Sequence, residues 1–413
     1  MEKRKIPAVR FKGFEDDWEQ RKFSDLYAPL VERNSDLLPY NKTFSVATMT
    51  YKTDGNGAAD SSLANYKRLR TGDIAFEGHT SKSFRYGRFV LNDVGDGIMS
   101  PRFSALRPLT QMPTNFWKYY IHYEPIMRKV LVASTKAGTM MNELVIDEFL
   151  KSSVLVPSIE EQTRIGGILK NIDNLITLHQ RKLEKLQLVK KTMLEKMFPK
   201  NGSKIPEIRF EGFADDWEQR KLGEVIRLNG RIGFRGYTEK DIVSKDDGGV
   251  LTFSPTNIVD NKLTTNCKNT YITRFKYDES PEIKIHNGDI LFVKTGSTLG
   301  KSALVTGLSE DATLNPQVVV MRTNNLNAEF LAAMLVTNTI IMQVNSAKIG
   351  GAVPTLTETR IKDFDVSIPV SEAEKEQIGK FFSQLDHLIT LHQRKLEKLK
   401  SFKKSLLEKL FVQ

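Results

Sequence analysis

"LITLHQRKLEKL" occupies residues 175–186 and recurs, letter for letter, at residues 388–399. The recurrence is part of a longer repeat, because residues 173–198 match residues 386–411 at 19 of 26 positions. A second segment, residues 6–23, returns as residues 205–222 with 13 of 18 positions identical. Each unit is about 200 residues long, far above the repeat periods of solenoid proteins. The sequence therefore predicts one module that is written twice.

The recurring stretch is helical in pattern, with core-type positions at alternating steps of four and three. These positions form a predicted coiled-coil seam: Ile172, Ile176, His179, Leu183 and Leu186 in the first copy, and Leu385, Ile389, His392, Leu396 and Leu399 in the second. Because the module is duplicated, we expect the two helices to pack antiparallel around a pseudo-twofold axis. Full overlap would then place His179 opposite Lys403, and Lys190 opposite His392. The alternative is that each helix packs only on its own domain.

The segments between the repeated flanks, residues 24–133 and 223–345, share little sequence. Strand-type residues bounded by turn signals predict strands at 44–51, 73–77, 87–94, 250–254, 289–296 and 316–323, and shorter helices are expected within 114–133 and 327–345. We predict an α+β chain with two similar α/β domains in an internal duplication, each followed by a long helix. The expected bounds are 1–155 and 201–368 for the domains, and 156–200 and 369–413 for the helical segments.

Composition limits the kind of protein. The net charge of +11 and the pI near 9.4 favour a polyanionic partner. No stretch approaches the roughly 18 apolar residues needed to cross a bilayer, so we expect no membrane partner. A single cysteine, Cys267, suits a cytoplasmic location, and six scattered histidines give no metal-binding spacing.

Basic residues interleaved with aromatic ones point to nucleic acid, because Lys and Arg neutralise phosphates while Arg and Gln read base edges. The alternative for each residue is a solvated charged surface. The DNA-binding candidates are Lys67, Arg68, Arg70, Lys82, Arg85, Arg88, Arg102, Arg231, Arg235, Lys294, Ser297, Lys301, Gln317 and Lys348.

A catalytic role is not predicted. The stretch "TGSTLGKSA" (295–303) ends like a phosphate-binding loop, but only three residues separate Gly296 from Gly300 where four are required. We predict instead a β-hairpin that presents Lys294, Thr295, Ser297 and Lys301 to a phosphate backbone. An NTP-dependent enzyme that uses Lys301 remains one alternative. Another is a coiled-coil scaffold whose α/β domains bind protein partners.

The paired starts "IP-x-x-RF-x-GF-x-x-DWEQRK", the paired "HQRKLEKL" helices, Gly-Asp-Ile before a strand and "DGIMSPRF" (96–103) together resemble the specificity subunit of type I restriction-modification systems. The resemblance covers nearly the whole chain. It implies two target-recognition domains that read a split, asymmetric DNA sequence, with no catalysis and no cofactor in this chain. It also implies two methyltransferase subunits that use S-adenosylmethionine, and restriction subunits that use ATP with Mg. Twenty-six helical residues span about 39 Å, close to one turn of B-DNA, so two half-sites separated by unread bases are expected.

Overall fold

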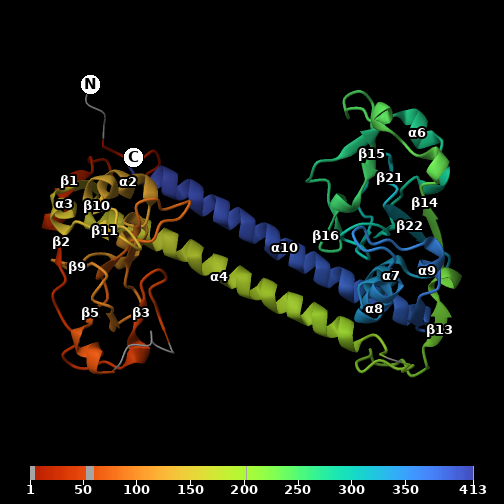
Figure 1. Ribbon diagram of the computed structural model, residues 1–413, viewed down its shortest axis with the longest axis horizontal. Helices are drawn as coiled ribbons and strands as arrows, with labels where there is room; N and C mark the ends of the chain where they lie inside the picture. The colour runs from red at the N-terminus through yellow and green to blue at the C-terminus, as the bar shows by residue number, and fades with distance from the viewer. Residues whose placement is uncertain (1–4, 53–59, 201, 413) are drawn as a thin grey trace. The chain divides into compact units, whose positions relative to one another are not determined.

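The computed structural model describes residues 5–52, 60–200 and 202–412 (Figure 1). The chain forms two compact units. The first comprises Met1–Gln180 together with Arg394–Gln413, and the second comprises Arg181–Gln393. The long helices α4 (Ile159–Lys196) and α10 (Glu372–Leu410) each contribute one part to each unit.

The first unit is mixed α/β. Its strands are β1 (Glu19–Lys22), β2 (Tyr27–Pro29), β3 (Phe44–Ser45), β4 (Thr50–Tyr51), β5 (Lys67–Leu69), β6 (Ile74–Glu77), β7 (Arg88–Leu91), β8 (Gly97–Met99), β9 (Ala105–Pro108), β10 (Thr135–Lys136), β11 (Glu143–Leu144) and β12 (Ser153–Val156). Its helices, besides the parts of α4 and α10, are α1 (Thr114–Tyr120), α2 (Glu124–Ser134) and α3 (Ile146–Lys151).

The second unit has the same kind of structure. Its strands are β13 (Glu218–Lys221), β14 (Ile226–Gly230), β15 (Val250–Phe253), β16 (Ile258–Val259), β17 (Lys262–Leu263), β18 (Thr270–Ile272), β19 (Ile290–Val293), β20 (Ser302–Leu304), β21 (Ala312–Leu314), β22 (Val318–Thr323) and β23 (Asp365–Ile368). Its shorter helices are α5 (Leu222–Val225), α6 (Arg274–Asp278), α7 (Ala328–Leu335), α8 (Asn338–Ala347) and α9 (Glu358–Lys362).

The two units share a central four-stranded sheet despite their different sequences. The strand order is β2-β9-β6-β7 in the first unit and β14-β22-β19-β20 in the second. The register also agrees, because Ile74 pairs with Leu106 in one sheet and Ile290 pairs with Met321 in the other. The predicted internal duplication of an α/β domain, each copy followed by a long helix, is therefore confirmed. Smaller sheets differ, since β5 pairs antiparallel with β8 whereas β15 pairs parallel with β21.

The repeated start segment has a structural role in both units. Strand β1 pairs with β12 just before α4, and β13 pairs with β23 just before α10. Each start also buries a tryptophan, Trp18 or Trp217, at no more than 2% exposure. An arginine in each start segment, Arg10 or Arg209, forms a bidentate ion pair with a buried glutamate at the beginning of the long helix. The constant sequence thus fixes the entry into each long helix.

Each core is completed by the last turns of the long helix that follows the other domain in sequence. In the first unit, Leu410 and Phe411 join the core formed by Trp18, Phe116 and Ile165. In the second unit, residues 193–198 from the end of α4 take the same place. Backbone hydrogen bonds strengthen both junctions, from the start segments at residues 9 and 208 to residues 409 and 196. The two modules therefore exchange their helix ends.

Inside each unit the paired parts of α4 and α10 run antiparallel. In the first unit Lys403 Nζ lies 2.7 Å from Asp173 Oδ1, and in the second Lys190 Nζ lies 2.7 Å from Asp386 Oδ1. The prediction that His179 faces Lys403 and that His392 faces Lys190 is therefore wrong. The helices have 38 and 39 residues, more than the 26-residue repeat from which the register was inferred, which moves the centre of their overlap to lower residue numbers. Each lysine meets a carboxylate that compensates its charge.

Other local predictions are confirmed with changed bounds. The patterns at 73–77, 87–94 and 250–254 contain β6, β7 and β15. The pattern at 44–51 is a tight hairpin instead of one strand, because Met49 adopts a φ of 48° between β3 and β4. Each expected shorter helix is broken into two, α1 with α2 and α7 with α8. No single helix among the described residues is long and apolar enough to span a membrane; α7 and α8 meet that test only as a pair bent by 62°.

Candidate nucleic-acid interface

The same arginine–aspartate ion pair occurs in both central sheets. Arg107 Nε and Nη2 donate to the two carboxylate oxygens of Asp73 at 2.9 and 2.8 Å. Arg322 makes the same two bonds to Asp289, each at 3.0 Å. Both aspartates follow the Gly that precedes a central strand, and their side chains are 1% and 8% exposed. Positions in the two units can therefore be matched by counting from these arginines.

A tight four-residue turn lies shortly before each arginine, and its third residue stands five positions before that arginine. In residues 100–103 the Phe103 N–H donates to the Ser100 carbonyl at 3.2 Å. In residues 315–318 the Val318 N–H donates to the Asn315 carbonyl at 3.0 Å. Each turn has proline at its second position, which presets the backbone. The third position is Arg102 in one unit and Gln317 in the other, and both are exposed.

Two further loops approach each turn. In the first unit these are residues 78–87, between β6 and β7, and residues 136–143. The Asn142 N–H donates to the Gly78 carbonyl at 3.0 Å, and Arg102 Nη2 lies 4.0 Å from Met140 Sδ. A Cβ at Gly78 would lie 2.0 Å from the Asn142 carbonyl oxygen, so only glycine permits this approach.

The second unit repeats the arrangement with residues 294–301 and 348–356. The Lys294 N–H donates to the Gln317 carbonyl at 2.9 Å, and the Gly296 N–H donates to the Pro354 carbonyl at 2.9 Å. Residues 294–301 form the connection of the β19–β20 hairpin, so the predicted hairpin is confirmed and a phosphate-binding loop that leads into a helix is not formed. We call these groups of three loops the first surface (78–87, 100–103, 136–143) and the second surface (294–301, 315–318, 348–356).

The first surface contains three of the predicted DNA-binding residues, and a fourth lies at its edge. Lys82, Arg85 and Arg102 are exposed on it. Arg88, at its edge, is half-buried, stacks 4.8 Å over the Phe84 ring and donates to the Ala47 carbonyl. The exposed side chains bring positive charge to the turn that carries Arg102.

Of the other candidates in the first unit, Arg68 and Arg70 lie away from this surface in a network of ion pairs, and Lys67 lies beneath it. Arg68 is 7% exposed and contacts Asp36 and Asp96. Arg70 donates to Glu32, and this hydrogen bond, with that of Arg107, lowers the pKa of Glu32 to about 2. Lys67 donates to the Phe103 carbonyl, and burial lowers the pKa of its amine. Lys67 therefore supports the 100–103 turn from beneath.

In the second unit, Ser297, Lys301, Gln317 and Lys348 lie on the second surface, while Lys294 pairs with Glu358 at 3.0 Å. Arg231 is buried and has a supporting position. It donates to the Leu314 carbonyl at 2.9 Å and to Thr313 Oγ1 at 3.0 Å, and burial lowers its pKa. Arg235 lies 3.4 Å from Glu282.

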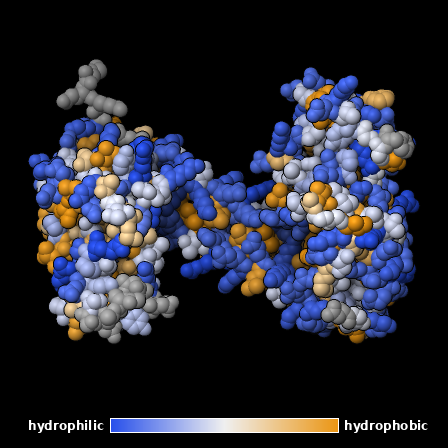
Figure 2. Space-filling view, viewed as in Figure 1, coloured by the Kyte–Doolittle hydropathy of each residue, from blue (hydrophilic) through white to orange (hydrophobic). Residues whose placement is uncertain are grey.

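The predicted seam positions are mostly turned away from solvent. Ile172, Leu385, Ile389 and Leu396 are buried, and the other six are half-buried. Neighbouring apolar residues outside the series are exposed, among them Leu178 at 51% and Leu188 at 64%. The helix surface is largely hydrophilic with apolar patches (Figure 2). A coiled coil over the full helix length stays a prediction.

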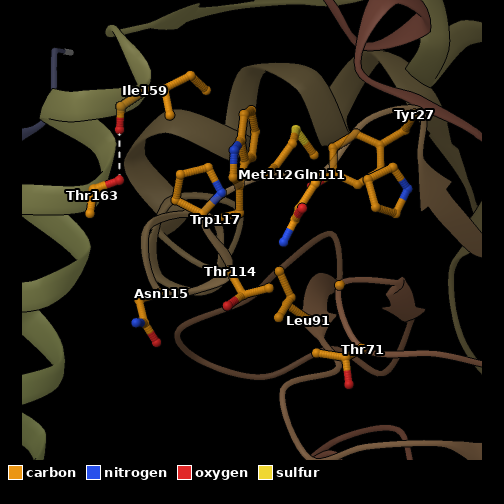
Figure 3. Close-up of a pocket in the computed structure, with 13 residues that line it drawn as sticks. Tyr27, Thr71, Leu91, Gln111, Met112, Thr114, Asn115, Trp117, Ile159 and Thr163 are labelled. Carbon is orange, nitrogen blue, oxygen red and sulfur yellow. Dashed lines mark hydrogen bonds between the residues drawn. The ribbon is translucent and has the colours of Figure 1, made fainter.

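A cavity of about 710 Å³ lies in the first unit beside the start of α4 (Figure 3). Trp117, Gln111 and Asn115 are among the 13 residues that line it, and none of those 13 carries a charged side chain. Among the described residues, no group of three or more His, Cys, Asp or Glu side chains could hold a metal ion. The first surface carries cations and the aromatic rings of Phe84 and Tyr86, and the second carries cations and the amide of Gln317.

Sequence reasoning missed the residues that hold the turns in place. Asn315 accepts from the Gln317 N–H at 2.8 Å and donates to Tyr237 Oη at 2.9 Å. The Tyr237 ring lies 5.4 Å from the Arg231 guanidinium. The alignment of "SPRFSALR" (100–107) with "NPQVVVMR" (315–322) was a sequence signal for the equivalence of the two turns, since both place Pro six residues before the arginine.

Comparisons with known proteins agree with this architecture. The family described as type I restriction modification DNA specificity domain matches residues 72–188 and 214–401, well over half of the chain. The type I restriction enzyme MjaVIII specificity subunit of Methanocaldococcus jannaschii is 23% identical over 329 residues, covering 76% of this chain and 74% of that relative. A putative MjaX specificity subunit of the same organism is 24% identical over 205 residues, covering 48% and 46%.

Among solved structures, the type I restriction-modification S subunit from M. genitalium has a TM-score of 0.62 at 13% identity. The alignment covers 98% of this chain and 99% of that one, which shows a shared fold. With both modules matched, the chain belongs to the family of type I restriction-modification specificity subunits, as a non-catalytic subunit that recognises DNA through two recognition domains.

Proposed function

We propose that the chain recognises a bipartite, asymmetric DNA site and thereby directs adenine methylation and restriction by partner subunits. The observation that supports this most is the pair of surfaces described above. They share one backbone arrangement, anchored by Arg107 and Arg322, but present different side chains. Two equivalent surfaces of different chemistry suit two different half-sites.

Charge supports DNA as the ligand of both surfaces. Lys82 and Arg85 in the first unit, and Lys301 and Lys348 in the second, provide cations next to exposed turn residues. Cations of this kind neutralise phosphates and position a protein on the duplex, while planar side chains between them reach base edges. A scaffold that binds only protein would not require cations on both surfaces.

The long helices are the proposed docking elements for the partners. Leu178, Leu188 and Phe402 are 51%, 64% and 51% exposed on α4 and α10, among charged neighbours. Exposed apolar side chains that recur along a helix are typical of protein interfaces. One solved structure of similar fold, at TM-score 0.51, is described as concerning complex assembly of the type I restriction-modification system. We propose two methyltransferase subunits as partners here, with restriction subunits joining them.

The chemistry is assigned to those partners. The methyltransferase subunits would use S-adenosylmethionine to methylate adenine, and the restriction subunits would use ATP with Mg. This chain would bind no cofactor. Its contribution would be to place the partners on the correct sequence.

The test is to co-express the full chain with its methyltransferase and to map adenine methylation in the host DNA by long-read sequencing. A split adenine-methylated motif is expected. Exchange of residues 24–133 for the corresponding segment of another recognition domain should change one half of the motif and leave the other half unchanged. A stable complex that produces no split motif would contradict the proposal.

A further inference from the structure

We propose that Arg102 and Gln317 occupy the same base-reading position in the two domains, where Arg102 reads guanine and Gln317 reads adenine. This inference rests on the proposed function, since it assigns the chemistry by which each surface would distinguish bases. It starts from the finding that the two residues stand at the same place in two domains whose sequences around them differ.

The equivalence has three independent supports. Both residues lie five positions before the arginine that pairs with the strand aspartate, Arg107 or Arg322. Both hold the third position of a proline-containing turn closed by a hydrogen bond from the fourth residue to the first. Both turns lie beside the loop that follows β6 or β19 and beside a loop that precedes α3 or α9.

Both turns are held from below by buried or half-buried groups. The carbonyl of Phe103 accepts from the half-buried Lys67 amine, which fixes the end of the first turn. In the second unit Asn315 bonds both the Gln317 N–H and the Tyr237 hydroxyl, and Arg231 stacks over Tyr237. Rigid placement of an exposed side chain is what base readout requires, because two hydrogen bonds must form at once.

The identities of the two side chains distinguish base readout from phosphate contact. A position that neutralises phosphate charge in both domains would carry a cation in both, and Gln317 carries none. Other residues of each surface already provide cations, Lys82 and Arg85 in one unit, Lys301 and Lys348 in the other. Arginine and glutamine share a planar end with paired hydrogen-bonding groups, suited to the O6 and N7 atoms of guanine and the N6 and N7 atoms of adenine, respectively.

The experiment is a residue exchange in the full chain, co-expressed with its methyltransferase and read by methylome sequencing. Arg102→Gln should shift one G·C pair of the first half-site toward A·T and leave the second half-site unchanged. Gln317→Arg should shift one A·T pair of the second half-site toward G·C. The expected change in the ratio of methylation between the two base pairs at that position is roughly 5- to 150-fold, the range for one bidentate base contact. Arg128→Gln is the matched control, on an exposed part of α2 outside both surfaces, and should leave the motif unchanged.

The possible outcomes separate this inference from the proposed function. If the natural chain produces no split motif, both are contradicted. If it produces one, and either exchange leaves every base preference unchanged, only the assignment of Arg102 and Gln317 is overturned. If Arg102→Gln abolishes methylation, a binding assay decides between the two readings. It measures the affinity of the assembled complex for a set of duplexes that each differ from the site at one base pair. A loss of affinity confined to duplexes with one particular G·C pair supports base readout by Arg102. An equal loss of affinity on all duplexes overturns it.

Discussion

Replacement of Arg10 by methionine should destabilise the first unit strongly. Arg10 Nε and Nη2 each lie 2.8 Å from an oxygen of Glu161, whose side chain is 1% exposed. The hydrogen bonds to Glu161 are also the main reason that the pKa of Arg10 is raised. Removal of one partner leaves a buried carboxylate without compensation, which costs about 3–5 kcal/mol. For a unit of this size, that corresponds to a fall in melting temperature of roughly 6–20 °C.

The duplicated module supplies a second measurement of the same effect. Arg209 makes the same contacts with Glu374, at 2.7 and 2.8 Å, and the Glu374 side chain is fully buried. Arg209→Met should therefore destabilise the second unit by a similar amount. Calorimetry of the full chain would measure the loss, and hydrogen exchange at the first turns of α4 and α10 would show which unit opens.

Two further variants make the reasoning refutable. Combining Arg10→Met with Glu161→Leu removes the stranded charge and should recover most of the lost stability. Lys12→Met, on an exposed position of the same segment, should change little. A loss below about 1 kcal/mol for Arg10→Met, the range of surface ion pairs, would refute the argument. So would a double variant no more stable than Arg10→Met alone.

Three other outcomes are expected. The folded-state pKa of Glu32, about 2, lies below its ordinary value of 4.5, so ionised Glu32 stabilises the first unit above about pH 4.5 and this contribution disappears as the pH falls toward 2. In acid titrations followed by circular dichroism, Glu32→Gln should lack this component; an unchanged acid profile would contradict the ion-pair assignment. Lys301→Ala should reduce the slope of log affinity against log salt concentration by about 1 without changing the methylated motif. Fluorescence anisotropy at several salt concentrations measures this slope, and an unchanged slope would show that Lys301 makes no phosphate contact. Inserting one heptad within 176–190 and one within 389–403 should widen the unread gap of the methylated motif by about 3 base pairs, since seven helical residues add about 10.5 Å; an unchanged gap with normal methylation would exclude this dependence on helix length.

Sequence periodicity and repetition predicted the duplication, the α/β class and the two long helices, because these depend on patterns of residues close together in the chain. The ion-pair partners were not predictable in this way. Lys403 was expected to face His179, yet it pairs with Asp173, since the register depends on the full lengths of both helices. Arg68 looked like a surface cation, but acidic groups far away in sequence enclose it. Contacts between distant segments decide which basic residues remain available to a ligand.

The exchange of helix ends has a consequence for how the protein is made. The ribosome releases the first domain well before residues 394–413 exist, yet the core of that domain includes Leu410 and Phe411. The second unit is continuous from Arg181 to Gln393, and residues 193–198, which complete its core, are synthesised before the segments they pack against. The domain that emerges first is therefore the last to be completed. A chain cut short near its end would leave the first domain with an open apolar groove, exposed to chaperones and proteases, while the second domain could fold fully.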